Sequence, residues 1–234
     1  MTDQRTALVT GANRGIGLEV ARQLSHRGFH VFLGVRHPEA GVKACAELGK
    51  GQAKLDWVEM DMTKDESIRA AVKKVSSSTD HLDVLVNNAG ICEDASSSIL
   101  DLEVAVVWRT LATNTVGPLL ALQHFLPLLR KSQAGRVINV SSGLGALHQM
   151  GSGYPSYRLS KAALNAFTRI AAAELGTAKI AVNSVSPGWV RTDMGGPDAT
   201  SSLEEGADTI VWLATEAPQS LTGQFVEDRK TIAW

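Results

Sequence analysis

The sequence has few of the features that are typical of a secreted protein, of a protein stabilised by a metal ion or of a membrane protein. Only two cysteines, Cys45 and Cys92, occur among its 234 residues, and they form no Cys-x-x-Cys pair. This scarcity argues against a disulfide framework and a thiolate metal site, so we expect no metal. The apolar run near the amino terminus is too short for a signal peptide, and no run approaches the roughly 18 apolar residues of a membrane span. We therefore expect a cytoplasmic protein.

An excess of charge of one sign is also missing. The formal net charge is −1, with 23 Lys and Arg residues against 24 Asp and Glu, and the basic residues are scattered along the chain. Nucleic acids and membrane surfaces bind clustered positive charge, so neither is expected as a partner. What is there, 44% hydrophobic and 20% charged residues, is typical of a soluble globular protein. We expect residues 1–234 to form a single domain.

Short apolar runs alternate with longer helical patterns along the chain. Strands this apolar belong to a sheet buried on both faces, and the alternation predicts a parallel, doubly wound α/β sheet with helices on both faces. Strands are expected at Thr6–Thr10, His30–Val35, Leu55–Met60, Val84–Val86, Arg136–Val140, Ile180–Val185 and near Gln224–Val226. Helices are expected at Ile16–Arg27, Pro38–Leu48, Asp65–Ser76, Ser156–Leu175 and Leu203–Thr215, with a long stretch from about Leu100 to Arg130 that Pro118 and Pro127 kink or break.

A glycine-rich segment separates the first predicted strand from the first predicted helix. Glycines allow a tight turn and let the backbone approach a pyrophosphate, whose charge the helix N-terminus stabilises. Any strand-to-helix turn favours glycine, but this segment opens the first βαβ unit, where a dinucleotide site must lie. The predicted contacts in this segment are Gly11, Asn13, Arg14, Gly15, Ile16 and Gly17.

The spacing of this segment, Thr-Gly-x-x-x-Gly-x-Gly, resembles the fingerprint of the short-chain dehydrogenase/reductase family. The resemblance covers nearly the whole chain, because further motifs follow in the family's order. They are Asn87-Asn88-Ala89-Gly90, Asn114 in the long helical stretch, Ser141-Ser142, Tyr157 to Lys161, and Pro187-Gly188. The resemblance implies a Rossmann-type oxidoreductase with a nicotinamide cofactor.

The end of the second predicted strand indicates which nicotinamide is bound. NAD-preferring sites place a carboxylate there, whereas this chain has Arg36, with Arg14 in the glycine loop. Two guanidinium groups can clamp a 2′-phosphate through charge-assisted hydrogen bonds, so NADP(H) is favoured. Two solvated arginines are the alternative reading.

Family resemblance implies further cofactor contacts. Asp61 would meet the adenine amine, although it is also suited to start the next helix as an N-cap. The remaining contacts that the resemblance implies are Met62, Asn88, Gly90, Tyr157, Lys161, Pro187, Gly188, Val190 and Thr192.

Tyr157 and Lys161 are the candidate catalytic pair. They stand four residues apart in a helical pattern, so both project from one face, and an ammonium near a phenol lowers the phenol's pKa. This would turn a poor acid into a usable proton donor. Tyr154 is a rival, but it is followed four residues later by Arg158 instead of a lysine.

Two further catalytic residues rest on the resemblance. Ser142 corresponds to the hydroxyl that hydrogen-bonds the substrate oxygen, although the interval from Ser142 to Tyr157 is a couple of residues longer than usual in the family. We assign the extra residues to the loop 143–156. Asn114 would complete a tetrad, its distorted helix freeing a carbonyl that links Lys161 to solvent.

The segment after Pro187 resembles the carbonyl-reductase subgroup. We expect NADPH-dependent reduction of a small-molecule ketone, aldehyde or quinone, in a pocket lined by Leu147, Met150, Tyr154, Trp189 and Met194, each of which also suits ordinary packing. A 3-oxoacyl-thioester reductase, a secondary-alcohol dehydrogenase and a non-catalytic NADP sensor are the alternatives. Animal carbonyl reductases carry an insertion before the tyrosine that is absent here, which predicts a homodimer or homotetramer through the uncovered long helices.

Overall fold

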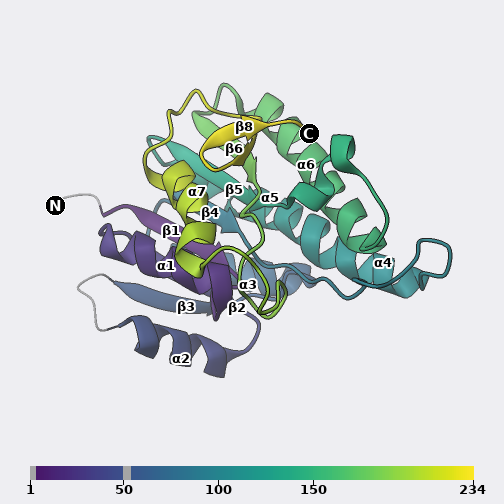
Figure 1. The fold of residues 1–234 in the computed structure, drawn as a ribbon. Coiled ribbons are helices and arrows are strands. Elements are labelled where there is room, and N and C mark those ends of the chain that lie inside the picture. Colours follow the sequence, from purple (N-terminus) through teal and green to yellow (C-terminus); the bar gives the residue numbers. More distant parts are fainter. Residues whose placement is uncertain (1–3, 50–53) are drawn as a thin grey trace.

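The centre of the molecule is one eight-stranded sheet (Figure 1). The structure, a computed structural model, describes residues 4–49 and 54–234. The strand order is β3-β2-β1-β4-β5-β6-β7-β8, in which β1 to β7 run parallel and β8 is antiparallel to β7. The strands are β1 (Thr6–Thr10), β2 (His30–Val35), β3 (Leu55–Glu59), β4 (Val84–Asn87), β5 (Gly135–Val140), β6 (Ile180–Val185), β7 (Phe225–Glu227) and β8 (Lys230–Ile232). The predicted doubly wound sheet is confirmed, apart from the antiparallel edge.

Helices cover both faces of the sheet, as the apolar strands require (Figure 1). They are α1 (Gly15–His26), α2 (Pro38–Leu48), α3 (Asp65–Ser76), α4 (Val104–Leu111), α5 (Gly117–Leu129), α6 (Pro155–Leu175) and α7 (Leu203–Thr215). A hydrophobic core lies on each face of the sheet, and alternate residues of β1 contribute to the two cores. Val9 packs with α1, α2 and α7, whereas Leu8 packs with α3, α5 and α6. Both side chains are fully buried, which is why the strand shows no polar face.

The long predicted helix is interrupted before Pro118. The helix begins at Val104, four residues after the predicted Leu100, and a π-helical turn at Ala112–Val116 joins α4 to α5. Pro118 explains the turn, because proline has no N–H to donate and its ring clashes with the carbonyl four residues earlier, that of Asn114. Pro127, by contrast, lies inside α5 without ending it.

Strand β8 is the part of the sheet that the sequence did not predict. It begins after Asp228 and Arg229, which both have positive φ and turn the chain back. Three residues of mixed polarity carry too weak a pattern to be read as a strand, and β8 exists because β7 offers a free edge. Within residues 4–49 and 54–234, no helix is long and apolar enough to cross a membrane.

Candidate active site

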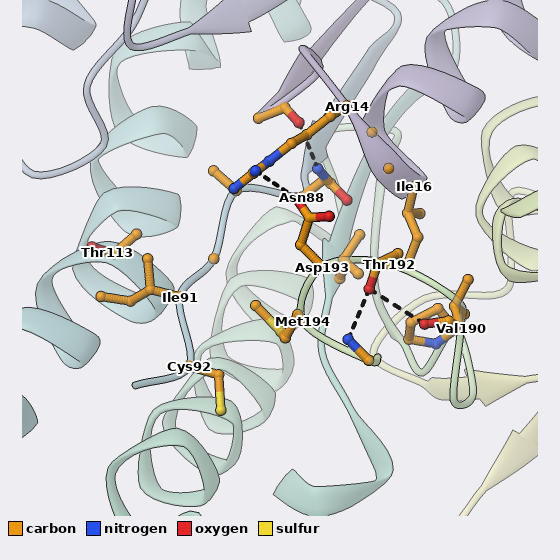
Figure 2. Close-up of a pocket in the computed structure, with 18 of the residues that line it drawn as sticks. Arg14, Ile16, Asn88, Ile91, Cys92, Thr113, Val190, Thr192, Asp193 and Met194 are labelled. Carbon is orange, nitrogen blue, oxygen red and sulfur yellow. Dashed lines mark hydrogen bonds and ion pairs between the residues drawn. The ribbon is translucent and has the colours of Figure 1, made fainter. Parts of the chain in front are cut away.

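A cleft of about 530 Å³ opens at the carboxyl ends of the parallel strands. Residues that follow successive strands line it, among them Gly11 after β1, Arg36 after β2, Asn88 after β4 and Pro187 after β6. Chain order reverses between β1 and β4, so the cleft lies at the switch point where open α/β sheets bind their ligands. Figure 2 shows the loop of Val190 to Met194 facing Arg14, Asn88 and Cys92 across this space.

The glycine loop is held in a shape that other residues could not adopt. Gly11 has a φ of +64°, and a Cβ at Gly17 would lie 2.4 Å from the Nδ2 atom of Asn88. That amide donates to the carbonyl oxygens of Thr10 (2.9 Å) and Gly11 (3.2 Å), which ties the loop to the end of β4. The side chain of Asn88 is therefore engaged with the protein, and it shapes the floor of the cleft.

The N-terminus of α1 fits an anion. Arg14 occupies the N-cap position without a side-chain hydrogen bond to the helix, and the first turn carries no acidic residue. Its first N–H groups have no partner within the helix and point toward the cleft with the positive end of the dipole. A pyrophosphate satisfies both requirements, so these residues fit the dinucleotide cofactor that the sequence predicts.

Arg14 has a second partner that the sequence did not suggest. Its Nη1 atom lies 2.5 Å from the Oδ2 atom of Asp193, across the mouth of the cleft (Figure 2). The two residues are 179 positions apart, and only the fold brings them together. Arg36 also lines the cleft and is exposed, so Arg14 and Arg36 border the same space, and the guanidinium group of Arg14 is already paired.

Asp61 follows β3 by two residues, and its carboxylate is hydrogen-bonded to neighbouring residues. Its Oδ1 atom accepts from the N–H (3.0 Å) and the hydroxyl (2.7 Å) of Thr63, and Lys64 lies 3.4 Å from Oδ2. Burial raises the pKa of Asp61, but these hydrogen bonds and Lys64 outweigh it, and the net pKa is lowered. The N-cap position of α3 is Lys64, so Asp61 is not the N-cap.

Ser142 and Tyr157 meet inside the cleft. Ser142 follows β5, and its Oγ atom accepts the N–H of Leu144 (3.1 Å), which leaves the hydroxyl proton free to be donated. The Ser142 hydroxyl acts to lower the pKa of the Tyr157 phenol. The longer interval between them is taken up by short 3-10 turns at Gly143–Gly145 and Leu147–Gln149, so the two ends still converge.

Lys161 lies near Tyr157 but does not shift its pKa as the sequence predicted. The Nζ atom donates to the carbonyl of Val140 (2.7 Å) and lies 5.5 Å from the centre of the Tyr157 ring. Burial raises the pKa of Tyr157, with a smaller contribution from Cys92, and Lys161 is not among the causes. The prediction of a lowered phenol pKa is therefore wrong for this structure, because burial raises the pKa and Lys161 contributes no shift against it.

Burial also lowers the pKa of Lys161, to about 8. The side chain is 4% exposed, so the charged form has lost most of its solvation. Both members of the pair are thus shifted toward their neutral forms. A neutral phenol carries the proton that a reduction needs.

Asn114 is buried beside the cleft and does not line it. Its Oδ1 atom accepts the N–H of Ile91 (2.9 Å), and its Nδ2 atom donates to the Ile91 carbonyl (2.9 Å) and to Ser160 Oγ (3.0 Å). The side chain thus clamps the segment after β4 to α6. Pro118, four residues further on, offers the main-chain carbonyl of Asn114 no N–H donor of the α-helical kind.

The predicted substrate pocket is only partly brought together. Tyr154, Trp189 and Met194 line the cleft, but Leu147 and Met150 do not. Leu147 is 69% exposed and faces a separate hollow against α6 and Trp234, because the 3-10 turn at 147–149 carries it outward.

Every predicted cofactor contact lines the cleft, as do Ser142, Tyr157 and Lys161. Other lining residues were missed, most of them neighbours of predicted ones, among them Gly34, His37, Ala89, Ile91, Cys92, Leu144, Arg191 and Asp193. Cys92 had a usable signal, since it follows the Asn-Asn-Ala-Gly motif by two positions. Burial raises the pKa of its thiol, so it presents an uncharged wall beside Tyr157.

A glycine loop at the switch point of a parallel sheet, beside a serine, a tyrosine and a lysine, defines a dinucleotide-binding oxidoreductase. The model of the short chain dehydrogenase family matches residues 5–202. The chain belongs to the short-chain dehydrogenase/reductase family.

Known relatives extend the match over the full chain. Carbonyl reductase (NADPH) 1 of the rabbit Oryctolagus cuniculus is 35% identical, covering 100% of this chain and 99% of the relative. A 3-oxoacyl-(acyl-carrier-protein) reductase of Aquifex aeolicus is 32% identical over 95% of this chain and 94% of its own length. The crystal structure of NADPH-bound carbonyl reductase from chicken fatty liver superimposes with a TM-score of 0.91, at 31% identity and 99% coverage of both chains.

Proposed function

We propose that this protein reduces ketone, aldehyde or quinone carbonyls with NADPH, and that Tyr157 donates the proton. One observation carries the proposal: a buried phenol whose pKa is raised lines the same cleft as Ser142 and the glycine loop. The phenol is protonated at neutral pH and faces the space where a substrate oxygen would meet the Ser142 hydroxyl. The carbonyl reductases among the relatives support the substrate class.

The residues divide the chemistry between them. Bound NADPH would supply the hydride for the carbonyl carbon. Ser142 stabilises negative charge on the substrate oxygen through its free proton, and Tyr157 protonates that oxygen. Lys161, with a pKa of about 8, is poised to return a proton to the tyrosine near neutral pH, and the carbonyl of Asn114 opens its route to solvent.

The choice of tyrosine is tested by a matched pair of variants. Tyr157→Phe is expected to abolish NADPH oxidation with a ketone, while NADPH binding is largely kept because the ring and its packing remain. Tyr154→Phe is expected to retain turnover, since Tyr154 lies at the N-cap of α6 with no lysine one turn away. A Tyr157→Phe enzyme with near-normal rates, beside an inactive Tyr154→Phe, would refute the assignment.

The NADP(H) preference rests on Arg36 and Arg14 in the cleft, and on the absence of an acid at the end of β2. Arg36→Asp is expected to weaken NADPH binding by about tenfold to a hundredfold while NADH changes little, because the added carboxylate repels a 2′-phosphate and accepts from ribose hydroxyls. Equal effects on both cofactors in a fluorescence titration would remove the basis for this preference.

A second candidate, reduction of a 3-oxoacyl thioester, is favoured by the Aquifex relative. The cleft wall offers apolar surface for either substrate, from Ile91, Cys92, Leu144, Trp189 and Met194. A screen of NADPH oxidation over ketones, quinones and acyl thioesters, compared by kcat/KM, separates the two. A preference of about a hundredfold or more for the thioester would replace the carbonyl-reductase assignment.

We further propose a single-domain, cytoplasmic homo-oligomer. Val104 and Trp108 on α4 and Val116 in the π turn form an exposed apolar stripe with four- and eight-residue spacing, and Leu159 is exposed on the adjacent α6. A second copy of the chain would cover this face. Trp108→Lys is expected to shift the mass measured by light scattering to that of a monomer.

Free thiols at Cys45 and Cys92 suit a reducing compartment, which supports the proposed cytoplasmic location.

A further inference from the structure

Asp94 is a buried carboxylate that the proposed chemistry leaves unused. It lies in the segment between β4 and α4 and is 1% exposed. Its Oδ2 atom accepts the backbone N–H of Ser156 (2.5 Å) and the Ser156 hydroxyl (2.7 Å). Its Oδ1 atom is buried without a partner among residues 4–49 and 54–234. A buried carboxylate costs several kcal/mol of desolvation, so its retention calls for a reason.

The place where Asp94 binds is the first turn of α6. Tyr154, the N-cap of that helix, has a φ of +54° and provides no side-chain cap, and Pro155 has no N–H. Ser156 therefore carries the first N–H of the helix, and Asp94 is its acceptor. A carboxylate at this point also interacts favourably with the helix dipole.

The next residue is Tyr157. Ser156 is fully buried, and its Oγ atom also lies 3.2 Å from the hydroxyl of Thr110, so α6 is joined at this point both to the segment after β4 and to α4. The direction in which the Tyr157 ring leaves the helix depends on how this first turn is seated. A displacement of the turn moves the phenol away from Ser142.

We propose that Asp94 is a positioning residue, which fixes the first turn of α6 through Ser156 and thereby holds the Tyr157 phenol at the reacting carbonyl. Asp94 does not line the cleft; it acts through Ser156. The inference rests on the proposed role of Tyr157 as proton donor.

Two substitutions at Asp94 test whether it positions Tyr157 through Ser156. Asp94→Ala removes the acceptor and is expected to lower kcat by about tenfold to a hundredfold, since small misplacements of a catalytic group have that effect, with the KM for NADPH within about twofold. Asp94→Asn keeps one acceptor oxygen, and its amide takes the place of the unpartnered oxygen, so kcat is expected to stay within about threefold. The solvent isotope effect on kcat should rise in the alanine variant alone, because proton transfer becomes limiting.

Asp83 provides the matched control. Its Oδ2 atom accepts the N–H of Thr6 (2.7 Å) and its Oδ1 atom the hydroxyl of Ser132 (2.5 Å), which are the same two kinds of donor, and the Nε2 atom of His81 lies 3.3 Å from Oδ2. Asp83 precedes β4 and thus lies at the opposite end of the sheet from the cleft. Asp83→Ala is expected to lower the free energy of unfolding and leave kcat unchanged. If Asp94→Ala does not fold, Asp94→Ser, whose short hydroxyl leaves the cavity polar, is expected to show the same loss of kcat.

Amide hydrogen exchange measures, without any substrate, how firmly Asp94 holds the first turn of α6. Residues 154–161 should exchange faster in Asp94→Ala and not in Asp83→Ala. Unchanged exchange, an alanine or serine variant with normal kcat, or equal losses in the alanine and asparagine variants would overturn the inference. A wild-type protein that turns over no carbonyl, with exchange behaving as expected, would instead refute the proposed function.

Discussion

Replacing Lys161 by methionine should stabilise the protein while removing its activity. Burial lowers the pKa of Lys161 from the ordinary 10.5 to about 8. At pH 7 the folded state therefore carries a desolvated ammonium, at a cost of about 3 kcal/mol, since each pKa unit corresponds to about 1.4 kcal/mol. Methionine removes this cost and also the hydrogen bond to Val140, worth about 1 kcal/mol. The net gain in the free energy of unfolding is expected to be about 2 kcal/mol.

The pH dependence of the free energy of unfolding tests independently whether burial lowers the pKa of Lys161. Below pH 8 the lysine is protonated in both the folded and unfolded states; between pH 8 and 10.5 the unfolded chain binds the extra proton, so wild-type stability rises with pH. Tyr157 acts in the opposite sense, because its raised pKa removes stability above pH 10, and measurements should stop there. In Lys161→Met the rise should vanish.

Urea unfolding followed by tryptophan fluorescence, from pH 7 to pH 10, measures both quantities. Lys73→Met is the matched control, because Lys73 is exposed on α3 and its removal should change neither the stability nor its pH dependence. A Lys161→Met protein that is less stable than wild type at pH 7, or that keeps the rise with pH, would refute the reasoning that burial lowers the pKa of this lysine.

Two substitutions and one labelling experiment test other parts of the site. Asp193→Asn frees Arg14 and should tighten NADPH binding by up to about fivefold at low salt, as expected for an exposed ion pair; weaker binding in a fluorescence titration would contradict competition between Asp193 and the cofactor. Cys92 should react slowly with maleimide at neutral pH and faster above pH 9, because burial raises the pKa of its thiol; rapid labelling at pH 7 by mass spectrometry would count against this. Pro118→Ala restores a donor to the carbonyl of Asn114 and should lower kcat several-fold, with a larger solvent isotope effect; an unchanged effect would show that the carbonyl is not needed.

Much of the fold and of the cofactor site was predictable because it depends on local pattern. Apolar strands such as Ile180–Val185 can only be buried on both faces, which requires helices on both sides. Glycines between a strand and a helix, such as Gly11 and Gly17, form an anion site with the N-terminus of that helix, whatever the rest of the fold. The order of the motifs then fixed the family without any knowledge of distances.

The tertiary structure alone decided the electrostatics of the site. The pKa of Tyr157 depends on how much solvent the fold removes from it, and no spacing along the chain states that amount. Likewise Asp193 meets Arg14, and Asp94 meets Ser156, across chain separations that no periodicity relates. Sequence patterns determine which faces are buried, because burial follows short-range periodicity; partners and pKa values arise only where distant segments pack.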